Sequence, residues 1–137
     1  MAKNEIVSFV LNSHSSRWPN SVITESILLS RNTNKLAFIQ LDENMNVFAR
    51  TTITLNQEDV LSFFKFLEHI RKDLEDNYPA IDSWTGSWNL DLEYQARHIE
   101  RIHGATNQFP HSEEIIERLN EMLERVQCDI APHYFTL

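Results

Sequence analysis

Residues 83–94, with the sequence SWTGSWNLDLEY, alternate between two kinds of side chain more regularly than any other stretch of the chain. The apolar positions, together with one glycine, are Trp84, Gly86, Trp88, Leu90, Leu92 and Tyr94. The polar positions between them are Ser87, Asn89, Asp91 and Glu93. Because successive side chains of a strand point to opposite faces, this stretch predicts a strand with one buried face and one polar face.

The residues that follow indicate that this strand belongs to a hairpin. QAR at residues 95–97 fits a tight turn, and HIERIHG at residues 98–104 fits the returning strand. The two glycines of the chain, Gly86 and Gly104, bracket the hairpin, so we expect each to supply a bulge or a positive φ. Trp88 lies mid-strand on the apolar side and is predicted to be buried in the core.

Three or four further strands are predicted before the hairpin, depending on whether residues 5–11 form the first. Their residues are rich in β-branched and aliphatic side chains, and polar turns such as RNTN and DENMN interrupt them. These strands are expected at residues 5–11, 22–30, 35–41 and 47–55. Because short connections join antiparallel neighbours, these strands predict a meander.

Between the meander and the hairpin, the apolar period changes from two residues to about 3.6, which indicates a helix. Its apolar stripe consists of Val60, Phe63, Phe64, Leu67, Ile70 and Leu74. Thr54 with Gln57, or Asn56 alone, is expected to cap its start. Tyr78-Pro79 is expected to end it, because the residue before a proline disfavours helical geometry.

A second helix is predicted after the hairpin, with Ser112 as its cap. Its apolar stripe consists of Ile115, Ile116, Leu119, Met122, Leu123 and Val126. Glu114 with Arg118, and Glu121 with Arg125, are four residues apart, so they are expected to pair on the helix surface.

These elements predict an α+β fold, in which two amphipathic helices pack on a mostly antiparallel sheet made of the meander and the C-terminal hairpin. The chain has 137 residues, a length that suits one domain with a substantial core. Residues 1–137 are therefore expected to form a single domain.

The net charge of −8 is distributed unevenly along the chain. Residues 1–55 contain five Lys/Arg and four Asp/Glu, which gives +1, whereas residues 56–137 contain seven and sixteen, which gives −9. An acidic surface repels phosphate backbones and anionic lipids, which argues against direct nucleic-acid binding and membrane binding. It favours a protein partner with a basic surface.

The single cysteine, Cys128, has no partner for a disulfide within the chain, which is typical of a reducing compartment. The first residues, MAKNEIVSFVLNSHSS, lack the cleavage site of a signal peptide, and no stretch has the length and apolar character of a membrane span. We therefore expect a cytoplasmic protein. No glycine-rich phosphate loop, dinucleotide fingerprint or nucleophile motif is present, so neither a cofactor nor catalysis is predicted.

The polar face of the hairpin is the first candidate site, and its composition depends on the turn. A two-residue turn places Glu93 opposite His98 and Asp91 opposite Glu100, all on one face. A three-residue turn places Asp91 opposite Arg101 instead, and the cluster disperses. Both registers are compatible with the sequence. The candidate interaction residues are this cluster and one aromatic anchor at the hairpin mouth, namely Trp84, Asp91, Glu93, His98 and Glu100.

A second candidate site lies at the mouth of the hairpin, where Trp84, His103, Asn107 and His111 are expected near one another. Such a site would serve a small ligand-binding or metal-binding module, or an enzyme. None of the six histidines falls in an H-x-x-x-H or H-E-x-x-H pattern, so no metal ligand is predicted. Whether His98, His103 and His111 converge in the fold is left open by the sequence.

The run SWNLDLEY…IERIHGATNQFPHSEEIIERLNEML, within residues 84–126, resembles a pattern found in small bacterial α+β proteins. The pattern has a Trp-x-Leu-x-Leu strand, a return strand ending in Gly, an Asn and a Pro shortly afterwards, and an amphipathic helix. Its residues here are Trp88, Leu90, Leu92, Gly104, Asn107 and Pro110. Such proteins are often uncharacterised, or are similar to immunity proteins and to inhibitors encoded by phages or their hosts. The resemblance implies a fold and carries no catalytic residue.

The sequence thus predicts a non-enzymatic interaction protein whose acidic surface binds a macromolecular partner, as an immunity protein or inhibitor does. The alternative is a small ligand- or metal-binding module, or an enzyme, with its site near residues 84–111. A homodimer formed through a strand edge or the aromatic tail is a third possibility.

Overall fold

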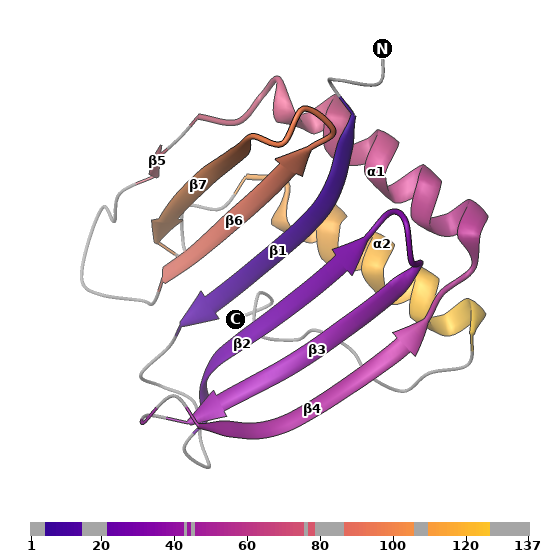
Figure 1. Ribbon diagram of the computed structural model, residues 1–137. Helices are drawn as coiled ribbons and strands as arrows, with labels where there is room; N and C mark the ends of the chain where they lie inside the picture. The colour runs from indigo at the N-terminus through magenta and orange to yellow at the C-terminus, as the bar shows by residue number, and fades with distance from the viewer. Residues whose placement is uncertain are drawn as a thin grey trace.

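The structure is a computed structural model in which residues 5–14, 22–42, 44, 46–75, 77–78, 87–105 and 110–126 are described. Its strands are β1 (Ile6–His14), β2 (Val22–Ser30), β3 (Lys35–Asp42), β4 (Val47–Thr54), β5 (Asn77–Tyr78), β6 (Ser87–Tyr94) and β7 (Ile99–Ala105). Its helices are α1 (Gln57–Arg71) and α2 (Ser112–Arg125). The predicted α+β fold is confirmed, and both helices cover the same face of the sheet (Figure 1).

The sheet places its strands in the order β4-β3-β2-β1-β6-β7-β5. Strands β1 to β4 form the predicted antiparallel meander, and β6 with β7 forms the predicted hairpin. The two units join where β1 pairs antiparallel with β6, with Phe9 opposite Leu92 and Leu11 opposite Leu90. Strand β1 therefore lies in the interior of the sheet, between one strand from each unit.

Apolar side chains of the central strands and of both helices meet in one core. Phe9 of β1 and Leu90 of β6 are completely buried. Phe63 of α1 meets Phe9 edge-on, with ring centroids 5.2 Å apart. Trp88 is buried as predicted, and its indole N–H donates a 2.8 Å hydrogen bond to the carbonyl of Ala105. This bond satisfies the one polar atom that burial of the indole ring would otherwise leave without a partner.

The apolar stripes predicted for the two helices are confirmed. Every position of the first predicted stripe is buried, although Leu74 lies beyond the end of α1, and in the second predicted stripe only Val126, which follows α2, stays partly exposed. The predicted end of the first helix at Tyr78-Pro79 is wrong, because α1 ends at Arg71. Residues 77–78 are instead extended and pair with β7. Within the described residues, neither helix has both the length and the apolar character needed to cross a membrane.

None of the predicted caps forms, and Thr54 is the last residue of β4 rather than the cap of α1. Asn56 occupies the N-cap position of α1, but its side chain makes no capping hydrogen bond, and its amide donates to Asp59 over 3.3 Å. The N-cap position of α2 belongs to His111, which has a φ of 63°. Ser112 is therefore the first helical residue rather than the cap. The Nδ1 atom of His111 lies 2.7 Å from a carboxylate oxygen of Glu114. The side chain of His111 therefore contacts the side chain of Glu114 and not a backbone N–H group of the first turn.

Gly104 allows β5 to lie close to β7 at one edge of the sheet. Strand β5 pairs in parallel with β7, and Tyr78 lies beside Gly104. A Cβ atom at position 104 would lie 2.6 Å from the Cβ and the carbonyl oxygen of Tyr78. The pairing of β6 with β7 passes Gly104 without a bulge, so close approach explains this glycine and the predicted bulge does not. Gly86 lies outside the described residues.

Gly104→Ala is expected to lower the free energy of unfolding by about 1–3 kcal/mol, because the added methyl group forces β5 away from β7. Urea unfolding measures this change. Ala96→Ser, in the exposed hairpin turn, is the control and should change stability by less than about 0.5 kcal/mol. A Gly104→Ala chain as stable as the wild type would show that β5 can move away from β7 without a loss of stability.

Candidate functional site

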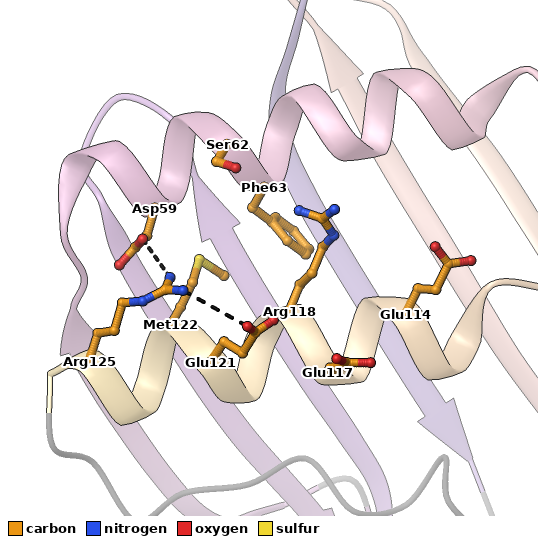
Figure 2. A pocket seen from close by; sticks show the side chains of 9 residues that line it. All are labelled: Asp59, Ser62, Phe63, Glu114, Glu117, Arg118, Glu121, Met122 and Arg125. Atoms are coloured by element: carbon orange, nitrogen blue, oxygen red, sulfur yellow. Dashed lines mark hydrogen bonds and ion pairs between the residues drawn. The ribbon is translucent and has the colours of Figure 1, made fainter.

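A groove runs between α1 and α2 on the outer surface of the helical layer (Figure 2). Its volume is about 380 Å³. Helix α1 contributes Asp59, Ser62 and Phe63 to the lining. Helix α2 contributes Glu114, Glu117, Arg118, Glu121, Met122 and Arg125. We refer to these nine residues as the α1–α2 groove.

The floor of the α1–α2 groove is apolar. Phe63 and Met122 are buried among the core residues, and each belongs to the apolar stripe of its helix. Asp59 precedes Phe63 by four residues, and Arg118 precedes Met122 by four. Because residues four apart lie on the same side of a helix, each floor residue has a charged neighbour one turn away. The apolar stripe and the charged face therefore meet along the groove.

Arg125 links the two helices at one end of the groove. One of its guanidinium nitrogens lies 2.7 Å from Oδ1 of Asp59 on α1, and the other lies 3.9 Å from Oε2 of Glu121 on its own helix (Figure 2). The predicted pair between Glu121 and Arg125 is thus confirmed. The side chain of Arg125 is 53% exposed and that of Asp59 only 17%, so water still reaches the guanidinium. An ion pair of this exposure contributes little to stability.

The second predicted pair on α2, between Glu114 and Arg118, does not form. The guanidinium of Arg118 instead lies over the ring of Phe66, 4.2 Å from its centroid, which is a cation–π geometry. Glu114 turns to His111. No described residue forms an ion pair with Glu117. Among the described residues, one carboxylate of the groove therefore has no cationic partner.

The charged side chains that line the groove carry a net negative charge. Four carboxylates face two guanidinium groups, and one guanidinium is already shared between Asp59 and Glu121. An apolar floor with carboxylates at its rim matches a lysine or arginine side chain, which has an aliphatic stem and a charged end. The arrangement is therefore suited to binding a cationic side chain.

The hairpin adopts the three-residue turn, so the compact cluster predicted for a two-residue turn does not form. Asp91 lies opposite Arg101, and Nε of Arg101 donates to Oδ1 of Asp91 over 2.9 Å. The turn closes with hydrogen bonds of 3.0 Å from Tyr94 N–H to the carbonyl of His98 and 2.9 Å from Arg97 N–H to the carbonyl of Tyr94. Arg97 has a φ of 66°, which permits this turn without a glycine.

Glu100 lies on the opposite face of the hairpin from Asp91 and binds α1. Arg71 donates two hydrogen bonds to its carboxylate, of 2.8 and 3.0 Å, and the hydroxyl of Tyr94 donates a third of 2.5 Å. The bonds from Arg71 lower the pKa of Glu100 below its ordinary value. Burial, together with the bond to Glu100, raises the pKa of Tyr94 to about 12. The ring of His98 stacks on that of Tyr94 at 4.5 Å. This cluster fastens the end of α1 to the hairpin.

The other predicted site residues are dispersed or lie outside the described residues. Glu93 is exposed opposite Ile99, and His103 is exposed on β7. Trp84 and Asn107 lie outside the described residues, so the predicted site at the hairpin mouth has no description. Over the described part of the chain, no three His, Cys, Asp or Glu side chains form a group that would hold a metal ion.

The α1–α2 groove was not among the sites predicted from the sequence. Its signal was present in α2, where five glutamates occur among fourteen residues and mark an acidic face. The missing information was which part of α1 faces those glutamates. Helices that begin 55 residues apart meet through tertiary packing, and helical periodicity gives no direct sign of that contact.

No family model matches the chain, and neither a curated protein nor a solved structure is significantly similar to it. The resemblance of residues 84–126 to immunity-type and inhibitor-type proteins therefore stays a prediction.

Proposed function

We propose that this protein is a non-enzymatic interaction protein that binds a basic segment of a protein partner in the α1–α2 groove. The observation that carries the proposal is the combination of an apolar floor with a negative rim, in which Glu117 has no ion pair with a described residue. A partner whose active site or nucleic-acid site is basic would be blocked by this contact. The proposed role is therefore inhibitor-like or immunity-like.

The charge of the whole chain supports the same proposal. The net charge of −8 produces a negative potential that attracts a basic partner before contact. Such steering raises the association rate, and salt weakens it, because the Debye length falls to about 8 Å at physiological ionic strength. Binding in the groove should therefore become weaker as the salt concentration rises.

A bound lysine or arginine side chain has a defined place in the groove. Its charged end lies among Glu117 and Glu121, and its stem crosses the small exposed parts of Phe63 and Met122 at the floor. Arg125 already occupies the position between Asp59 and Glu121, so it marks how a guanidinium is held there. Displacement of Arg125 would open a second carboxylate pair to the partner.

The double variant Glu117→Gln/Glu121→Gln is expected to bind a fluorescently labelled arginine-rich peptide about tenfold more weakly than the wild type, because two rim charges are lost. Fluorescence anisotropy at low salt measures the dissociation constants. The same titration at physiological salt should weaken wild-type binding more than binding by the double variant.

The matched control is Glu75→Gln/Glu93→Gln, which removes two exposed carboxylates outside the groove. Equal weakening in both double variants would mean that net charge alone attracts the peptide, and the groove would no longer be the binding site. Full affinity in Glu117→Gln/Glu121→Gln would contradict the proposal directly.

A further inference from the structure

The two edges of the sheet differ in whether a further strand pairs with them. At one edge, the two residues of the short strand β5 pair with His103 and Gly104 and cover that part of β7 (Figure 1). At the other edge, β4 is outermost, and no described strand pairs with its outer side. An uncovered edge presents backbone donors and acceptors to another strand.

Strand β4 also lacks most of the features that keep sheet edges from pairing. It contains no proline and no carboxylate, and Arg50 is its only charged residue. A register shift affects its first residues, but residues 49–54 pair regularly with β3. The threonines of this regular part, Thr51, Thr52 and Thr54, are exposed, as is Arg50. Threonine favours strands, so this segment is well suited to accept a partner strand.

We infer that β4 pairs antiparallel with β4 of a second copy of this chain, so that two sheets join into one continuous sheet across a twofold axis. This inference does not depend on the proposed function of the α1–α2 groove. The occupant is a second copy because β4 is complementary to itself. In a chain of net charge −8, β4 is a segment without carboxylates, so two β4 strands meet without repulsion between carboxylates of their own.

Symmetry restricts the register of this contact. The axis stands perpendicular to the sheet, and opposed residues must point to the same face, so the axis passes through a residue position. An axis at Arg50 would oppose two guanidinium groups and is unfavourable. An axis at Thr51 places Arg50 opposite Thr52 of the second copy, twice by symmetry. The register centred on Thr51 therefore avoids like charges and retains nearly the whole strand.

The decisive measurement is the solution mass by sedimentation equilibrium, over a range of protein concentrations. The wild type should reach twice the chain mass of 16.1 kDa. Thr52→Lys should raise the dimer dissociation constant about tenfold, because the new charge faces Arg50 of the second copy at two symmetric positions. This substitution also lowers the net negative charge, which by itself would favour association. Gln95→Lys, in the exposed hairpin turn, makes the same charge change away from β4 and should leave the dimer intact.

Thr52→Glu tests the register itself. With the axis at Thr51, the new carboxylate faces Arg50 of the second copy, so the dimer should tighten. Circular dichroism confirms that each variant is folded. A monomeric wild type at high concentration, or a Thr52→Lys chain whose dimer dissociation constant equals that of the wild type, overturns the inference. A Thr52→Glu chain that dissociates as readily as Thr52→Lys overturns the register centred on Thr51.

Discussion

Phe63→Ala is expected to lower the free energy of unfolding by about 3–5 kcal/mol and the melting temperature by about 10–20 °C. Phe63 is 1% exposed and contacts three other phenylalanines, among them Phe9 of the central strand β1. Its removal leaves a cavity between α1 and the sheet. Because a domain of this size has a total stability of only about 5–15 kcal/mol, the loss is a large fraction. Thermal and urea unfolding followed by circular dichroism measure it.

Leu61→Ala is the matched control, since it truncates a large apolar side chain on the same helix two residues away. Leu61 is 38% exposed, so its loss should change stability by less than about 1 kcal/mol. Similar effects from the two substitutions would show that α1 does not depend on Phe63 for its attachment. Phe63 also forms part of the floor of the α1–α2 groove. Because Phe63→Ala lowers the melting temperature, peptide binding by this variant should be measured only below that temperature.

Arg71→Met is expected to lower the free energy of unfolding by about 2–3 kcal/mol at neutral pH, because the half-buried carboxylate of Glu100 loses two charged hydrogen bonds. Methionine keeps the aliphatic stem of the arginine, so the change reports mainly on the lost charge and hydrogen bonds. Urea unfolding at pH 7 and at pH 3 measures the effect.

The pH dependence of this loss has a definite sign. The folded-state pKa of Glu100 is lowered from its ordinary value of 4.5, chiefly by Arg71. The stability that this shift contributes is therefore present above pH 4.5 and is lost as the pH falls through the lowered pKa. Arg71→Met should thus be less destabilising at pH 3 than at pH 7. A double-mutant cycle with Glu100→Gln should show coupling, and additive effects or a pH-independent loss would contradict the predicted pair.

The sequence predicts those elements whose residues alternate or repeat with a clear period. The strict alternation in residues 83–94 correctly places Trp88 in the core, and the period of 3.6 correctly identifies both helical stripes. Element boundaries are less certain, because they depend on tertiary contacts. Strand β5 illustrates this point, since its two residues pair with β7 where the sequence predicted the end of a helix.

The candidate sites depend on contacts that the sequence does not encode locally. The hairpin register follows from the left-handed conformation of Arg97, a residue that rarely adopts it, so both turns remained compatible with the sequence. Glu100 looked like part of a polar surface, yet the three-residue turn directs it toward Arg71 on α1. The acidic character of α2 is visible in the sequence. The groove, however, exists only because α1 supplies Asp59 and Phe63 opposite α2.

The interior position of β1 has a consequence for how the molecule is made on the ribosome. One neighbour of β1, strand β2, emerges soon after it, but the other is β6, whose Tyr94 follows its partner Ile6 by 88 residues. At a translation rate of about 5–20 residues per second, roughly 4–18 s separate these two positions. Throughout that interval, the side of β1 that later pairs with β6 has no strand partner. A chain that stops before residue 94 therefore keeps an unpaired strand edge at the position that becomes the centre of the sheet.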